Sequence, residues 1–235
     1  PPIVAGIMWW AVAKELPRSS MQSKQTSEGQ SYQIWTNGTL WLVAVLAFCE
    51  HALFFSWAGW MPYLMMTKGA SPDLAALMTS AILWIAIPIV FLMPWASDQI
   101  GLRKPFLWAS FIVLVLVSLS AIYAPLSLGW LLVVAIGVAN NCTYVMLLAL
   151  LPELVPAEGV GRASGMMLCI ANIGGLAGPW VAGRIIDITG TLNLHLIILI
   201  VLAAVATYLA FRLPETGPRA RLQSSRSRFY LERDK

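Results

Sequence analysis

Six long apolar segments, separated by short charged connections, most constrain how this chain folds. They cover residues 38–63, 74–96, 105–123, 128–151, 163–185 and 191–211. A helix of about 20 apolar residues crosses the roughly 30 Å hydrocarbon core of a bilayer. Because lipid offers the backbone no hydrogen-bond partners, an apolar run of this length is helical. The sequence therefore predicts an all-α membrane protein with six transmembrane helices.

The composition excludes a soluble globular domain. Of the 235 residues, 59% are hydrophobic and 11% are charged, whereas soluble domains have about 45–50% and about 25%. The basic residues lie between the apolar segments and in the tail, so the net charge of +4 indicates membrane topology and no nucleic-acid partner. Cys49, Cys142 and Cys169 lie inside apolar segments without a CxxC partner. Neither a disulfide framework nor a metal site is indicated, and no cofactor is expected.

We expect four regions along the chain. Residues 1–13 are apolar but too short to cross a bilayer, which is typical of the end of a truncated transmembrane helix. Residues 14–37 read as a polar linker, residues 38–211 as the six-helix domain, and residues 212–235 as a basic tail. The tail suits either binding to anionic lipid headgroups or a role in topology alone, and we favour the second.

Lysine and arginine predict the orientation in the membrane. All of the 15 basic residues except Lys68 and Arg184 lie in the linker, in the loops 97–104 and 152–162, or in the tail. An even number of crossings puts these parts on one side, and the positive-inside rule makes that side the cytoplasm. We expect a multi-pass protein of the plasma or inner membrane.

Polar and glycine residues recur in the same order along the two halves of the domain. Segments 105–123 and 191–211 are almost purely apolar and are expected to face lipid, whereas the other four carry the polar and glycine content. Each group of three segments thus has two richer helices followed by a plain one. This order is typical of two inverted three-helix repeats around a central cavity.

Glu50 and His51 lie near the middle of the first segment. An ionised group at that depth costs at least about 2.5–3.5 kcal/mol on insertion scales, so it should face a cavity or a partner. Helical spacing places Glu50 on one face with Phe54 and Trp57, whereas His51 is expected to point elsewhere. We predict a protonatable coupling site or a contact for a cationic or amide group; a structural carboxyl is the alternative.

The fourth segment carries the amides Asn140 and Asn141 and the phenol of Tyr144. Asn140 and Tyr144 are stacked at positions i and i+4 of a helix. Amides at mid-depth either join helices by hydrogen bonds, worth around 0.6–2 kcal/mol, or line a polar path. The sequence leaves both interpretations open.

Two further patterns concern packing and gating. In the fifth segment Gly174, Gly178 and Ala182 form a ridge of small residues that lets another helix approach closely, and Pro179 favours a bend.

The loop that follows the second segment carries charged residues around a glycine. These candidate gating residues are Asp98, Gly101, Arg103 and Lys104. They indicate either a charge network that holds one conformation closed or ordinary interfacial charges.

The loop resembles a motif of the major facilitator superfamily, G-x-x-x-D-(R/K)-x-G-R-(R/K). It matches at Asp98, Gly101 and Arg103 and departs at Pro94, Gln99 and Leu102. Other stretches resemble the superfamily in the same order. They are residues 6–10 (GIMWW), 152–156 (PELVP) with Arg162 and Gly165, 178–179 (GP), and 212–216 (RLPET). Residues 57–62 (WAGWMP) and 69–71 (GAS) resemble cyanate and nitroimidazole exporters of the superfamily.

The resemblance implies that the six helices are the C-terminal half of a twelve-helix transporter whose N-terminal half is the missing partner. It also implies alternating access, in which a small solute is held between the two halves and is transported by symport or antiport. Protons are a candidate coupling ion. Glu50 and the Asn140–Asn141 pair then fall on cavity-lining helices. A non-transporting scaffold or sensor is one alternative. An intramembrane enzyme is another, but no HExxH or comparable motif exists, and His51 and His195 lie on different segments.

Overall fold

The computed structural model describes residues 34–217 and 219, and it confirms the six expected membrane-spanning helices. The expected regions 1–13 and 14–33, and the tail apart from residues 212–217 and 219, lie outside the described residues. The long helices are α3 (Gly38–Thr67), α4 (Pro72–Ile100), α5 (Lys104–Tyr123), α6 (Gly129–Leu154), α7 (Ala157–Thr189) and α8 (Asn193–Arg212). Two short 3-10 turns, η1 (Ile34–Thr36) and η2 (Leu126–Leu128), precede α3 and α6.

Local chemistry explains where the first helices begin and end. The side chain of Asn37 accepts hydrogen bonds from the backbone N–H groups of Thr39 and Leu40, which have no partner inside α3. Ser71 caps α4 in the same way, and Pro72 at its first position needs no donor. Helix α4 ends at Ile100 and is capped by Gly101, whose φ of 75° is the left-handed conformation that glycine adopts without strain.

The helices extend beyond the apolar segments that predicted them. Helix α6 continues through Pro152 to Leu154, where the sequence suggested a turn, and α7 begins at Ala157 rather than at residue 163. Apolar composition marks where a helix leaves the hydrocarbon, whereas the backbone helix ends only where its hydrogen bonds end. The turn between α6 and α7 is therefore only two residues long.

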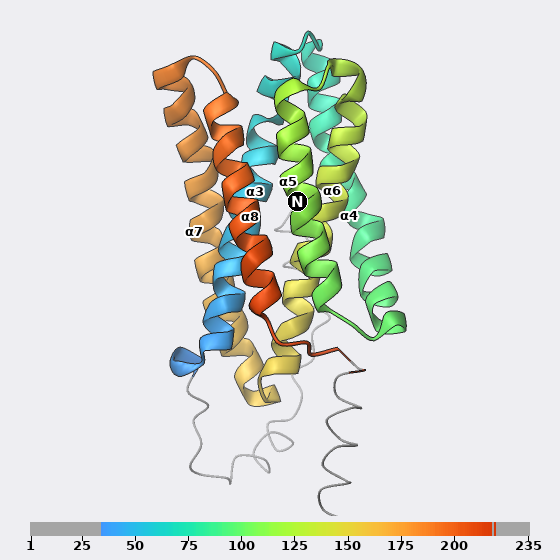
Figure 1. The fold of residues 1–235 in the computed structure, drawn as a ribbon, viewed down its shortest axis with the longest axis vertical. Helices are drawn as coiled ribbons and strands as arrows, with labels where there is room; N and C mark the ends of the chain where they lie inside the picture. Colours follow the sequence, from blue (N-terminus) through green and yellow to red (C-terminus); the bar gives the residue numbers. More distant parts are fainter. Residues whose placement is uncertain (1–33, 218, 220–235) are drawn as a thin grey trace, which may run out of the picture. The chain divides into compact units, whose positions relative to one another are not determined.

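Successive helices run in opposite directions (Figure 1). Helix α3 begins and α8 ends at the lower end of the bundle in this view, which also holds the connections α4–α5 and α6–α7. We call it the Arg103 end, after the residue at the start of α5. The connections α3–α4, α5–α6 and α7–α8 lie at the opposite end, as an even number of crossings requires.

The pairing of helices shows the repeat. Helix α3 packs along α7, α4 along α6, and α5 along α8. If α3 is exchanged with α6, α4 with α7 and α5 with α8, the pair α3–α7 becomes the pair α6–α4. The pair α5–α8 is unchanged by the same exchange. The lesser contacts α3–α8 and α5–α6 are exchanged in the same way. Because α3 and α6 run in opposite directions, the two groups of three helices are inverted repeats.

Apolar side chains remain uncovered on several helices. Helices α5 and α8 each bury one face against the bundle and expose the other, consistent with contact with lipid. Only 17% of the apolar stretch of α4 and 28% of that of α7 is buried, which are the lowest shares among the six helices. Large exposed side chains on them include Trp84, Phe91 and Trp95 of α4 and Leu176 and Trp180 of α7. Helix α4 therefore carries more exposed large apolar side chains than any other described helix, and the apolar stretch of α7 is the next least buried.

Candidate functional site

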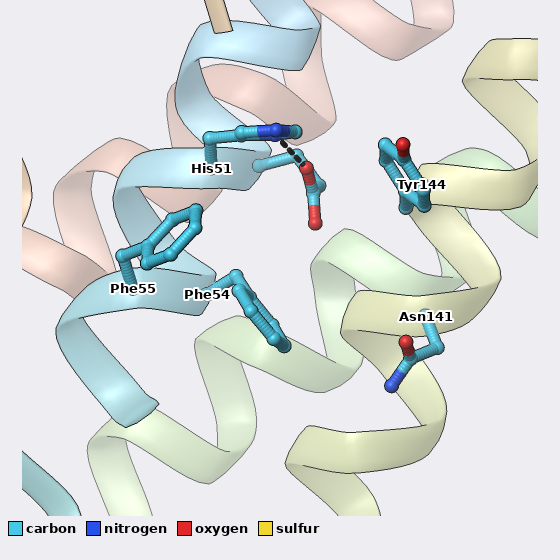
Figure 2. A pocket seen from close by; sticks show the side chains of 6 residues that line it. His51, Phe54, Phe55, Asn141 and Tyr144 are labelled. Atoms are coloured by element: carbon cyan, nitrogen blue, oxygen red, sulfur yellow. Dashed lines mark hydrogen bonds and ion pairs between the residues drawn. The ribbon is translucent and has the colours of Figure 1, made fainter. Parts of the chain in front are cut away.

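A cavity of about 240 Å³ opens between α3 and α6 (Figure 2). Four of its lining residues come from α3 and two from α6. They are Glu50, His51, Phe54, Phe55, Asn141 and Tyr144. One carboxylate, one imidazole, one amide and one phenol thus line a cavity whose remaining walls are aromatic. Such a site combines apolar surface with a few polar groups, as small-molecule sites do.

Glu50 and His51 form the polar centre of this cavity. Glu50 is only 3% exposed, and its Oε2 lies 2.5 Å from Nδ1 of His51. The expectation that His51 points elsewhere was wrong. Successive residues leave a helix about 100° apart, but two long side chains can lean toward the angle between them and meet. A buried carboxylate thereby obtains a partner from its own helix.

Aromatic rings surround the pair. The ring of His51 lies 5.6 Å from that of Tyr144 and 5.9 Å from that of Phe55, between ring centres. Figure 2 shows Tyr144 reaching from α6 toward His51, with Asn141 on the same helix. Asn141 donates a hydrogen bond of 2.7 Å from its amide to the carbonyl oxygen of Gly137 on its own helix. The site thus has a charged side on α3 and a neutral polar side on α6.

Two predicted site residues lie elsewhere. Trp57 and Asn140 are 2% and 0% exposed and do not line the cavity. Neither the indole N–H of Trp57 nor the amide of Asn140 has a hydrogen-bond partner among the described residues. Tyr144 shares the cavity with Asn141, three positions earlier, and not with Asn140. Phe55, which also lines the cavity, gave no signal in a sequence rich in apolar aromatic residues.

Glycines bring α7 against the stretch of α3 that carries the pair. A Cβ atom at Gly178 would lie 2.5 Å from the backbone oxygen of Ala52, and one at Gly174 would collide with the backbone of Phe48. The carbonyl oxygen of Pro179 accepts a 3.1 Å hydrogen bond from the indole N–H of Trp60. The glycine ridge predicted from the sequence therefore faces α3.

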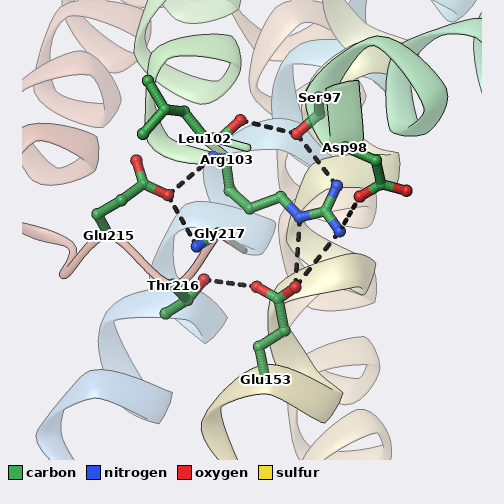
Figure 3. Close-up of polar contacts among 8 residues, drawn as sticks. All are labelled: Ser97, Asp98, Leu102, Arg103, Glu153, Glu215, Thr216 and Gly217. Carbon is green, nitrogen blue, oxygen red and sulfur yellow. Dashed lines mark hydrogen bonds and ion pairs between the residues drawn. The ribbon is translucent and has the colours of Figure 1, made fainter. Parts of the chain in front are cut away.

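A polar network lies at the Arg103 end (Figure 3). Arg103 is 8% exposed, and its Nη2 lies 2.6 Å from Oδ1 of Asp98 and 3.3 Å from Oε1 of Glu153. Its Nη1 donates to the hydroxyl of Ser97, which itself donates to the carbonyl oxygen of Leu102. One guanidinium thereby connects the end of α4, the start of α5 and the end of α6.

The segment after α8 completes the network. The carboxylate of Glu215 accepts hydrogen bonds from the backbone N–H groups of Arg103 and Lys104, at 2.8 and 3.2 Å. It thereby caps the start of α5, whose own preceding residue provides no side-chain cap. Thr216 donates a 2.7 Å hydrogen bond to Oε2 of Glu153. Of the four candidate gating residues, Asp98 and Arg103 pair through their side chains, while Lys104 contributes a backbone N–H.

Comparison with known proteins identifies the family. Residues 40–232 match the Major Facilitator Superfamily. The chain belongs to this superfamily. The chain is 24% identical over 183 residues to a Bacillus subtilis protein named as the transporter YycB. The aligned region covers 76% of this chain and 45% of the relative.

Two other superfamily relatives have names that include a substrate. The gentisate transporter of Corynebacterium glutamicum is 25% identical over 182 residues, covering 75% of this chain and 41% of the relative. The hexuronate transporter of Bacillus subtilis is 24% identical over 224 residues, covering 81% and 50%. The chain therefore spans about half the length of the curated relatives that it matches.

The superfamily motifs converge in space. Asp98 and Arg103 come from the loop motif, Glu153 from the stretch 152–156, and Glu215 and Thr216 from the stretch 212–216. These three stretches are separate in the sequence, and hydrogen bonds and ion pairs join them into one network. The sequence singled out Asp98 and Arg103 as candidate gating residues, whereas Glu153, Glu215 and Thr216 were noted only within stretches that resemble the superfamily.

Proposed function

We propose that this chain forms one six-helix half of a secondary transporter that moves a small solute across the plasma or inner membrane by alternating access. The observation that carries the proposal is the cavity between α3 and α6, where a buried acid–imidazole pair faces neutral polar groups in a superfamily chain. Isolated ionisable groups inside a membrane protein mark pathways for solutes or protons. In this proposal the protein is not an enzyme.

The partner in this proposal is a second six-helix half. The apolar stretches of α4 and α7 are the least buried of the six described helices, and the chain spans about half the length of its relatives. A partner half packed on these helices would enclose the solute path between the two halves. By the distribution of basic residues, the Arg103 end faces the cytoplasm.

The substrate class proposed first is a small organic acid. The names gentisate and hexuronate, carried by two relatives, both denote hydroxylated carboxylates. A cavity with one imidazole, one amide, one phenol and aromatic walls provides donors for a carboxylate and hydroxyls, and apolar surface for a ring. Cyanate and nitroimidazole belong in the same test panel because of the resemblance in residues 57–62.

Proteoliposomes that contain the chain together with its partner half are expected to take up at least one labelled solute of this panel above empty vesicles. The chain alone is expected to show no uptake, because six helices form only one wall of the path. Counterflow of labelled against unlabelled solute is the measurement. Uptake by the chain alone would contradict the two-half proposal. A two-half protein that binds solute, detected by tryptophan fluorescence, without transporting it would favour a scaffold or sensor.

Glu50→Gln is expected to reduce solute accumulation driven by an inward proton gradient by at least tenfold. Glutamine keeps the size of the side chain but cannot take up the proton. The measurement is accumulation at an external pH of 6 and an internal pH of 7.5. The control is Tyr123→Phe, a substitution at an exposed position at the end of the bundle opposite the Arg103 end, and it should behave as the wild type. Unchanged accumulation by Glu50→Gln would remove Glu50 from coupling.

A further inference from the structure

We propose that His51 is the carboxylate-binding residue of the cavity, and that Glu50 and the carboxylate of the substrate occupy its imidazolium in alternation. Protonation of Glu50 releases the imidazolium, the substrate carboxylate binds it, and one proton enters with each acid. This inference rests on the proposed function and adds the residue that selects the substrate.

The Glu50–His51 pair is isolated from other charged side chains of the described residues. Among the described residues, the titratable groups that line the cavity are Glu50, His51 and Tyr144. The helices packed against α3 bring no other charge to this depth. Helix α4 has none between Asp73 and Asp98, α6 none before Glu153, α7 none between Arg162 and Arg184, and α8 none between His195 and Arg212. The imidazolium of His51 is therefore the one side-chain cation available at the cavity in the described chain.

An unpaired charge at the position of this pair costs free energy. Glu50 is almost fully buried, and its Oε2 lies 2.5 Å from Nδ1 of His51. Burying a charge is costly unless an opposite charge accompanies it. The empty site and the loaded site each have one state in which every buried charge is paired. In one, ionised Glu50 pairs with the imidazolium; in the other, neutral Glu50 lies beside an imidazolium that is paired with the substrate carboxylate.

The geometry around His51 makes its imidazole the accessible member of the pair. Its side chain is 12% exposed, against 4% for Glu50, so the imidazole is the member of the pair nearer to the open cavity. The rings of Tyr144 and Phe55 lie on the sides of the imidazole, at 5.6 and 5.9 Å. A planar carboxylate carried by a small ring can reach the imidazole while the ring contacts these aromatic faces. Asn141 provides an amide on the opposite wall for a hydroxyl group.

The charge balance follows directly. A monocarboxylate brings one negative charge and the proton on Glu50 brings one positive charge, so the loaded site has the same net charge as the empty one. Transport of a monocarboxylate is then electroneutral and is driven by the proton gradient alone. A neutral amide of the same acid has no charge to exchange with Glu50, so it gains nothing from protonation.

The test uses isothermal titration calorimetry on the transporter, both halves together, in lipid nanodiscs. The probes are gentisate and glucuronate, each compared with its neutral amide, gentisamide and glucuronamide. Binding is measured at pH 5.5 and 7.5 in buffers of different ionisation enthalpy, which gives the number of protons taken up per bound probe. The wild type is expected to bind at least one acid at least tenfold more tightly at pH 5.5, with about one proton taken up. The matching amide should show neither effect.

Two variants separate the roles of the pair. His51→Gln is expected to lose at least tenfold in affinity for the acid at pH 5.5, with the affinity for the amide unchanged within about threefold. The double variant Glu50→Gln with His51→Arg carries a permanent cation without the competing carboxylate. It is expected to bind the acid equally well at both pH values with no proton uptake. Size-exclusion profiles and thermal unfolding identify any variant that fails to fold, and Tyr123→Phe is the unaffected control.

Several results would overturn the inference. They are wild-type binding of neither acid, equal binding of acid and amide by the wild type, wild-type acid binding without proton uptake, or undiminished acid binding by His51→Gln. Counterflow of a neutral solute such as nitroimidazole together with any of these results would leave the transporter proposal intact and reject His51 as an acid-binding residue. Absence of counterflow with every solute of the panel, despite binding, would reject the transporter proposal instead.

Discussion

Arg103→Ala is expected to lower the stability of the six-helix bundle by about 3 kcal/mol, a typical effect of removing one partner from a buried ion pair. Glu153, whose side chain is 11% exposed, would lose its paired cation, and Ser97 would lose the guanidinium donor. The exposed Asp98 contributes less, because water replaces its partner. For a protein of this size the unfolding midpoint should fall by about 6–12 °C. Thermal unfolding in detergent micelles measures this shift.

Lys104→Ala is the matched control for this experiment. Lys104 follows Arg103 directly and carries the same charge, but it donates to Glu215 through its backbone N–H, which alanine retains. Its midpoint should stay within about 2 °C of the wild type, because surface substitutions change stability by roughly 0.5 kcal/mol or less. Arg103→Lys should fall between the two, since lysine keeps the charge but lacks the fork that contacts several groups. Equal midpoints for Arg103→Ala and Lys104→Ala would show that the network contributes no stability.

The network also has a proposed role in gating. It joins α4, α5, α6 and the segment after α8 at the Arg103 end, which is proposed to face the cytoplasm. If it holds that end in one arrangement, the loss of Arg103 shifts the population toward the other arrangement as well as lowering stability. The stability measurement above and the counterflow rate of the two-half protein report these two effects separately.

The six helices could be predicted from the sequence because lipid permits few backbone structures, so length and apolar composition decide between them. Helix ends were less predictable. Pro152 and Arg162 suggested breaks at positions where the backbone continues, because a helix extends into the interfacial region beyond its apolar stretch.

The candidate site could be predicted only in part. The cost of a mid-depth charge identified Glu50 correctly as a residue that needs a cavity or a partner, but it could not identify His51 as that partner. Choosing between Asn140 and Asn141 required the rotation of α6, and neighbouring residues on a helix differ by about 100°. Helix rotation is determined by packing against other helices, which a single sequence does not reveal. The contacts of Glu153 and Glu215 with Arg103 and its backbone depend on the same packing.

Gly174→Ala is expected to destabilise the bundle by about 2–3 kcal/mol, although alanine is the better helix former. The added methyl group would overlap the carbonyl group of Phe48 on α3, and its distance from the Cα atom there would be only 3.1 Å. Backbone atoms cannot turn aside as a side chain can, so α7 must move away from α3, as in other overpacked interfaces. Thermal unfolding should show a midpoint lower by about 4–12 °C.

The same helix provides a control with the opposite expected sign. A Cβ atom at Gly165 would have no neighbouring atom within 4 Å, so Gly165→Ala changes the helix without changing its packing. It should stabilise α7 by up to about 1 kcal/mol, because alanine loses less backbone entropy than glycine on forming a helix. A pair of identical chemical changes in one helix thus separates packing from helix propensity. Midpoints that shift in the same direction for both variants would contradict close packing at Gly174.

The consequence for the cavity follows from the position of the collision. Phe48 and Ala52, which the glycines of α7 contact, lie two positions on either side of Glu50. Displacing α3 at Phe48 therefore moves the helix turn that holds the Glu50–His51 pair. Gly174→Ala should then weaken solute binding by at least tenfold, whereas Gly165→Ala should leave it unchanged. Normal binding in a Gly174→Ala protein of reduced stability would show that the α3–α7 contact supports the fold without positioning the site.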